Sequence, residues 1–179
     1  MISPTPSSRS FARAAALTSA LLLLVGCAPD PSPSPTPTPA FASEEEAFAA
    51  AEATYREFTA RLNELDTADP STFEPLFDLS SGEFEAADRE AYSAMHADGM
   101  TIQGQTIVTS FVGTLATEPF ETVTANVCLD VSDVTVTDSE GNSQVDPGRP
   151  DVYALNVTFV RDHARLTIDS ASRTSEVQC

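Results

Sequence analysis

The period of the hydrophobic pattern changes once along this chain of 179 residues, close to Gly99. Before that point, apolar residues recur every three or four positions, which is the period of an amphipathic helix. After it, apolar and polar residues alternate, which is the period of a half-buried strand. Helices followed by consecutive strands predict an α+β fold, with N-terminal helices packed on an antiparallel sheet of about four strands. We expect one such domain over residues 43–179.

Three helical segments are expected in the first half of the chain. Ser43 and Glu46 form a capping box, which predicts that the first helix begins here. Asp69-Pro70 predicts a second, short segment, and Ser80 with Glu83 predicts a third helix that ends at Gly99. The residues expected to face the core are Phe48, Ala51, Tyr55, Phe58, Leu62 and Leu65 in the first helix, and Phe84, Ala87, Ala91 and Met95 in the third.

Four strands are expected after Gly99, over residues 101–115, 123–131, 153–159 and 166–168. Asp162-His163-Ala164 is short enough to join the last two strands as a hairpin. Residues 138–151 contain two glycines and two prolines, which indicates a long polar loop.

The N-terminal segment has the pattern of a secretory signal. Arg9 and Arg13 precede a run without charges over residues 14–25, which is the order of a positive region followed by an apolar region. Twelve residues rise only about 18 Å as a helix, which is too short for a hydrocarbon core of about 30 Å. The chain is therefore expected to be exported, with residues 1–26 as the signal peptide.

Leu24-Val25-Gly26-Cys27, at the end of this run, resembles the lipobox of bacterial lipoproteins, often found in high-GC Gram-positive species. The resemblance implies cleavage between Gly26 and Cys27 and a diacylglycerol attached to the sulfur of Cys27. The protein would then be lipid-anchored on the extracytoplasmic side of the cell membrane. A plain cleaved signal with a cysteine there by chance is the alternative.

Residues 27–42 would be the lipidated cysteine and a linker. Proline stands at every second position from Pro29 to Pro39, which favours an extended, semi-rigid polyproline II spacer. A ligand for a proline-recognition domain is the other interpretation of this segment.

The formal net charge of −18 restricts the partners. An acidic surface repels nucleic-acid phosphates, so we expect no DNA or RNA partner. A basic protein or a divalent cation would be favoured, although an acidic surface that only maintains solubility is more common.

Cys128 and Cys179 are the cysteines that remain after Cys27. Export permits oxidation, and only one pairing exists, so a disulfide between them is expected. The alternating apolar residues from Val123 to Val131 have odd numbers, whereas Cys128 has an even number. Successive side chains of a strand point to opposite faces, so Cys128 should lie on the other face of the sheet. The bond would then strap the C-terminal tail over that face.

The order of a long amphipathic helix, shorter helices and curved antiparallel strands resembles the nuclear transport factor 2-like cone. A cystatin-like sheet is the alternative. The resemblance implies either a binding or assembly module or a small enzyme, and fold alone does not decide between these.

No catalytic residue, metal site or cofactor is predicted. His96 is expected to be structural at a helix end, His163 to be exposed in a turn, and Tyr55 and Tyr92 to pack in the core with the hydroxyl at its edge. The acidic residues before Gly141 do not have EF-hand spacing. The sequence thus favours a non-catalytic module that binds an envelope protein or a small ligand. The alternative is a cone enzyme, an isomerase or hydrolase, that uses a buried carboxylate or His96.

Overall fold

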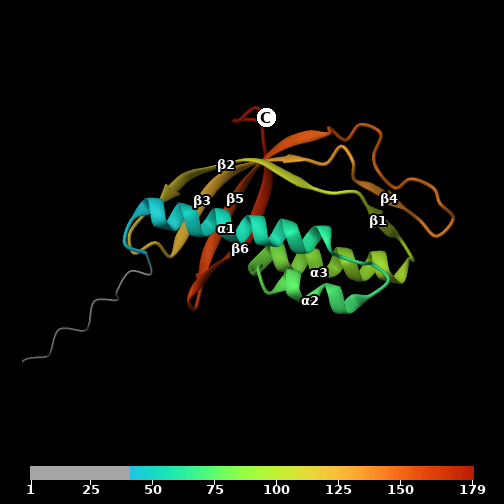
Figure 1. The fold of residues 1–179 in the computed structure, drawn as a ribbon, viewed down its shortest axis with the longest axis horizontal. Helices are drawn as coiled ribbons and strands as arrows, with labels where there is room; N and C mark the ends of the chain where they lie inside the picture. The colour runs from blue at the N-terminus through green and yellow to red at the C-terminus, as the bar shows by residue number, and fades with distance from the viewer. Residues whose placement is uncertain (1–40) are drawn as a thin grey trace, which may run out of the picture. The chain divides into compact units, whose positions relative to one another are not determined.

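Three α-helices precede the strands in the computed structural model of this protein, which describes residues 41–179. They are α1 (Glu44–Asn63), α2 (Glu74–Phe77) and α3 (Gly82–Ala97), with a short 3-10 helix, η1, at Pro70–Thr72. The helices lie along one face of a four-stranded antiparallel sheet (Figure 1). The expected α+β fold with about four main strands is therefore confirmed.

The start of α1 follows the predicted cap with one difference. Ser43 Oγ accepts a hydrogen bond from the Glu46 amide at 3.2 Å, while the Glu46 carboxylate accepts from the Ala42 amide rather than from that of Ser43. The expected apolar stripe faces the core, with Tyr55 and Phe58 each less than 5% exposed. This stripe fixes the orientation of α1 over the sheet.

The predicted start and inward face of α3 are partly wrong. Ser81, not Ser80, is the N-cap residue, because Ser80 is buried in a parallel bridge with Ile168. Ala87 and Ala91 are exposed, and the helix instead buries Tyr92. Tyr92 removes far more apolar area from water than two alanines would, so its burial decides the rotation of the helix.

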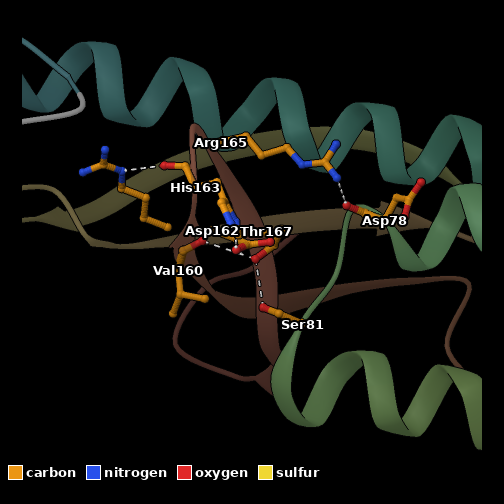
Figure 2. Close-up of polar contacts among 8 residues, drawn as sticks. Asp78, Ser81, Val160, Asp162, His163, Arg165 and Thr167 are labelled. Atoms are coloured by element: carbon orange, nitrogen blue, oxygen red, sulfur yellow. Dashed lines mark hydrogen bonds and ion pairs between the residues drawn. The ribbon is translucent and has the colours of Figure 1, made fainter.

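A group of polar contacts joins the hairpin of β5 (Val152–Asp162) and β6 (Arg165–Thr174) to the segment between α2 and α3 (Figure 2). The hydroxyls of Ser81 and Thr167 lie 2.9 Å apart, and the guanidinium of Arg165 donates to the carbonyl of Asp78. Because Ser81 begins α3, these contacts position the start of that helix against β6.

The main sheet has the strand order β2-β3-β5-β6, and all neighbours are antiparallel. Its strands are β2 (Ile107–Ala116), β3 (Thr122–Asp130), β5 (Val152–Asp162) and β6 (Arg165–Thr174). The face toward the helices carries fully buried side chains, including Val127, Val157, Phe159 and Ile168.

The first predicted strand is divided in two. β1 (Thr101–Gln103) leaves the main sheet and pairs with β4 (Thr135–Thr137), a strand that the sequence analysis did not predict. Gly104 permits the break because its φ is +89° and a Cβ there would lie 1.9 Å from the carbonyl oxygen of Asp133. The two short strands form a separate sheet beyond one end of the main one (Figure 1).

Cys128 lies on the sheet face that turns away from the helices, which we call the outer face. Its register partners are Ser110 and Ala154. The sulfur atoms of Cys128 and Cys179 are at disulfide distance, with their Cα atoms 5.7 Å apart. The C-terminal tail therefore crosses this face as the parity of Cys128 suggested.

Candidate ligand-binding site

A pocket of about 210 Å³ lies where the C-terminal ends of α1 and α3 meet the small sheet and β5. Five different parts of the chain contribute to it, so the tertiary fold and not a local motif creates the site. Half of its lining is aliphatic: Leu62, Met95, Ile102, Val131, Val134 and Val136. The other lining residues are Asn63, Tyr92, Gly104, Thr106, Arg149 and Tyr153.

Arg149 supplies the charged group of the pocket. Its Nη2 donates to the carbonyls of Val131 and Val134, each at 2.9 Å, so it fastens the turn between β3 and β4. Its Nε is buried without a hydrogen-bond partner. Arg149 is the one charged residue of the pocket lining, so its guanidinium favours an anionic or carbonyl group in this pocket.

Asn63 closes one wall of the pocket. Its amide nitrogen donates to the carbonyl of Thr106 at 2.9 Å, and its Oδ1 accepts from the amide of Thr106 at 2.8 Å. This pair connects the end of α1 to the chain just before β2. Since both polar atoms of the side chain are used, Asn63 shapes the wall and does not supply a free group to a ligand.

Tyr92 and Tyr153 bring aromatic rings to the site. Tyr92 is 9% exposed and packs beside Phe73, with ring centroids 5.9 Å apart. The guanidinium of Arg173 lies 3.9 Å from the ring centroid of Tyr153, a favourable cation–π distance. Both rings are therefore held by neighbours before any ligand binds.

Asp88 is the residue that the sequence analysis missed. It lies one turn before Tyr92 on the inward side of α3, and its Oδ2 is buried without a hydrogen-bond partner. Burial raises the pKa of Asp88 to about 6, because a desolvated carboxylate favours the neutral form. Burial and the charge of Asp88 also raise the pKa of Tyr92. Asp88 is not among the residues that line the pocket.

The period of the helix could have revealed Asp88. The three glutamates of the same helix point the other way, because they suggest a solvated surface. Asp88, however, stands four residues after Phe84 and four before Tyr92, so the period of the helix places it on the stripe that faces the core.

His96 lies in a second pocket of about 300 Å³, between η1–α2 and α3. Its Nδ1 donates to the carbonyl of Thr67 at 2.8 Å, which ties the end of α3 to the segment before η1. The charged group of this pocket, Arg89, is already engaged by Glu85 at 2.7 Å and by the ring of Phe77. The contacts of His96 are structural, in agreement with the prediction for this residue.

His163 and Tyr55, also considered in the sequence, do not line the pocket. His163 is exposed in the hairpin turn, as predicted, and its Nδ1 lies 2.6 Å from Asp162 Oδ1. Ser81 is drawn near this pair in Figure 2, but its hydroxyl bonds Thr167 and not the histidine. Tyr55 is buried in the core as predicted, and burial is the main cause that raises its pKa.

Two further features concern residues 41–179, a membrane-spanning helix and a metal site. No helix in that range has the length and apolar character needed to cross a membrane, and no cluster of three metal-ligating side chains occurs in it. The lipidation and cleavage residues, Gly26 and Cys27, lie outside the described part of the chain, as does most of the linker.

No protein-family model matches the sequence, and no curated protein matches it. Among solved structures, the intermembrane space region of the chloroplast protein ARC6 is similar, with a TM-score of 0.50 and 12% identity over 70% of this chain and 95% of that one. Aln2 from a Streptomyces species has a TM-score of 0.44 and 17% identity, over 73% and 90% of the two chains. A protein from Catenulispora acidiphila has a TM-score of 0.46 and 15% identity, over 71% and 89%.

At these identities the similarity shows the fold alone. The ARC6 region, at a TM-score of 0.50, agrees with the α+β arrangement of helices on an antiparallel sheet.

Proposed function

We propose that this protein is a lipid-anchored, extracytoplasmic binding module, whose cone holds a small apolar molecule with one anionic or carbonyl group. The observation that carries the binding role is the pocket itself. It combines six aliphatic side chains with one positive charge, the guanidinium of Arg149. An apolar cavity with few polar groups is the usual form of a small-ligand site.

The volume limits the size of the ligand. At about 210 Å³ the pocket is smaller than the clefts of about 300–1,000 Å³ that take drug-sized molecules. A short fatty acid or a small aromatic acid has the required chemistry. An envelope protein could insert a single apolar side chain here, but such a side chain would not use the positive charge of Arg149.

The pocket can be tested with octanoate as the probe, a short fatty acid whose binding is measured by titration calorimetry. Val136→Trp fills the pocket and should weaken probe binding at least about tenfold, since the ring occupies the volume that the probe needs. Ala91→Trp, on the exposed side of α3, is the matched control. Equal probe binding by wild type and Val136→Trp, with both folded, would contradict the proposed site.

The lipid anchor at Cys27 is supported by the lipobox resemblance and by the proline-rich segment that follows it. Two acyl chains give stable membrane attachment, whereas one gives marginal attachment. Cys27→Ala should therefore abolish incorporation of labelled palmitate and move the protein from the membrane to the soluble fraction. Palmitate labelling that persists in Cys27→Ala would refute the anchor, while leaving the pocket untouched.

A second candidate function rests on Asp88. A desolvated carboxylate with a pKa of about 6 is suited to general-base chemistry near neutral pH, as a small isomerase or hydrolase would need. Binding is preferred because Asp88 does not line the pocket. Turnover of ester, epoxide or ketone substrates that Asp88→Asn abolishes, with probe binding retained, would favour the enzyme.

A further inference from the structure

One wall of the pocket is formed by the small sheet of β1 and β4. Half of the lining residues lie in this sheet or next to it: Ile102, Gly104, Thr106, Val134, Val136 and Arg149. None of residues 101–106 or 132–150 is buried, whereas the walls from α3 and from the end of β3 contain the buried Tyr92 and Val131. Parts of a protein with few buried side chains open at a lower free energy than its core. The small sheet is therefore the wall that separates most readily from the rest of the domain.

The small sheet is held together by hydrogen bonds among its own parts. β1 pairs with β4, and within residues 41–179 neither strand pairs with a strand of the main sheet. β4 also bonds the loop that follows it, since the Gln144 amide donates to the Val136 carbonyl at 2.8 Å. Figure 1 shows β1 and β4 beyond the end of the main sheet. We call residues 101–105 and 135–148 the flap, because these internal bonds make them one unit.

The flap is fastened to the helices on both sides of β1. Before β1, the Met100 amide donates to the carbonyl of Met95 at 2.9 Å, and the Met100 carbonyl accepts from the hydroxyl of Thr67. After β1, the side chain of Asn63 bonds both backbone groups of Thr106. The flap can therefore move about Met100 and Thr106 while the contacts that fix its ends are kept.

Arg149 joins the base of the flap to the main sheet. Its Nη2 donates both to Val131, which directly follows β3, and to Val134, which directly precedes β4. Val131 is fixed in turn, because its amide donates to the carbonyl of Asp151 at 2.8 Å. Arg149 is also the one charged residue that lines the pocket. The side chain that would meet the acid group of a ligand therefore also holds the base of the flap.

We propose that the flap is the entrance to the pocket, and that Arg149 is a positioning residue that couples the acid group of the ligand to closure of the flap. This inference rests on the proposed function. An acid at the guanidinium adds a charge-assisted contact, which is stronger than a neutral one, while Arg149 stays bonded to Val131 and Val134. Since a ligand favours the state that it binds more tightly, an acid shifts the flap toward the closed state. A neutral molecule of the same apolar length lacks this contact and shifts the flap less.

Amide hydrogen exchange of the full chain tests the flap directly. In the free protein, we expect the amides of β1 and β4 to exchange at least about a hundredfold faster than those of β3 and β5, because the flap opens without the core. Octanoate at saturation should slow the exchange of β1 and β4 at least about tenfold. The first turn of α1, which frays but does not line the pocket, is the control and should not change. Equal exchange of β1 and β3 in the free protein would overturn the proposal.

A second ligand separates the acid group from the apolar chain. 1-Octanol has the chain length of octanoate without the acid, so at equal occupancy by titration calorimetry it should slow the flap at least about fivefold less. If calorimetry detects no binding of octanoate, the proposed function fails and this inference fails with it. If octanoate binds but slows the flap no more than octanol does, this inference alone is overturned and the binding site stands.

Variants of Arg149 distinguish coupling from a purely structural role. In Arg149→Gln the flap should exchange faster in the free protein, and octanoate should lose its advantage over octanol because the charge is gone. Arg149→Lys keeps a charge and should keep part of that advantage. Arg173→Gln, which removes the cation beside the ring of Tyr153, is the matched control and should keep all of it. Faster exchange in Arg149→Gln with an undiminished advantage of octanoate would mean that Arg149 only fastens the flap, and would overturn the proposal.

Discussion

Asp88 is a single residue whose burial lowers the stability of the fold at neutral pH. Its Oδ2 is buried without a partner, and burial raises its pKa to about 6. A group with a raised pKa in the folded state binds its proton more tightly there than in the unfolded chain. Its contribution favours folding below about pH 4, and it is lost as the pH rises through about 6.

Asp88→Asn should therefore stabilise the protein in a pH-dependent way. The gain should be near zero at pH 4 and on the order of 1–2 kcal/mol at pH 7, after allowance for partial solvent exposure. Urea unfolding of both proteins between pH 4 and 7 measures this difference.

The control for that experiment is Glu90→Gln, an exposed position on the same helix. It removes a carboxylate from an exposed position, so it controls for the loss of one negative charge. A constant difference between wild type and Asp88→Asn from pH 4 to 7 would mean that the carboxylate is solvated.

The hydrophobic pattern predicted the order of helices and strands better than it predicted the residues at which they begin. The change of period at Gly99 gave the order of helices and strands, because each period reflects burial along one continuous element. The N-cap of α3 was placed one residue too early, since Ser80 and Ser81 offer equivalent caps in sequence and only the bridge to Ile168 selects Ser81.

The candidate site could not be predicted in this way. Its lining comes from the C-terminal ends of α1 and α3, from the short strands β1 and β4, and from the loop that contains Arg149. No short stretch of the sequence therefore contains the site. β1 and β4 are three residues each, too short to show a period, and they exist because Gly104 lets the chain turn toward the backbone of Asp133.

Contact between α1 and β2 depends on a glycine. A Cβ at Gly113 would lie 2.3 Å from the ring of Phe48, so the helix approaches the strand closely there. Gly113→Val should lower the free energy of unfolding by about 1–3 kcal/mol, since Phe48 must move. Gly148→Ala, where the nearest atom is an exposed side-chain oxygen at 3.3 Å, is the control. Equal unfolding midpoints for the two variants would argue against this close approach.

The cysteine pair connects the C-terminal tail to β3 across 51 residues of chain. Closing a loop of that length should stabilise the fold by about 2–4 kcal/mol. We expect Cys128→Ser with Cys179→Ser to lower the unfolding free energy by that amount, and a reductant to have the same effect on wild type but none on the variant. The mass of the intact protein should rise by that of two hydrogens on reduction. Two free thiols in the exported protein would contradict the bond.

At the scale of the whole molecule, the charge of −18 sets the response to salt. Two effects oppose each other. Salt screens repulsion among the acidic side chains, which stabilises the fold, and it weakens ion pairs such as Glu52 with Arg56, which destabilises it. That pair is 40–50% exposed, and such pairs contribute only about 0.2–1 kcal/mol each. Repulsion should therefore dominate.

Stability should accordingly rise with ionic strength. Between about 10 mM and about 500 mM sodium chloride we expect the melting temperature to increase by several degrees, since about 1 kcal/mol corresponds to roughly 4 °C for a domain of this size. Choline chloride at equal ionic strength should have the same effect, because screening does not depend on the identity of the cation. A fall in melting temperature with salt would show that ion pairs outweigh the repulsion. A rise with sodium alone would indicate that the acidic surface binds a specific cation.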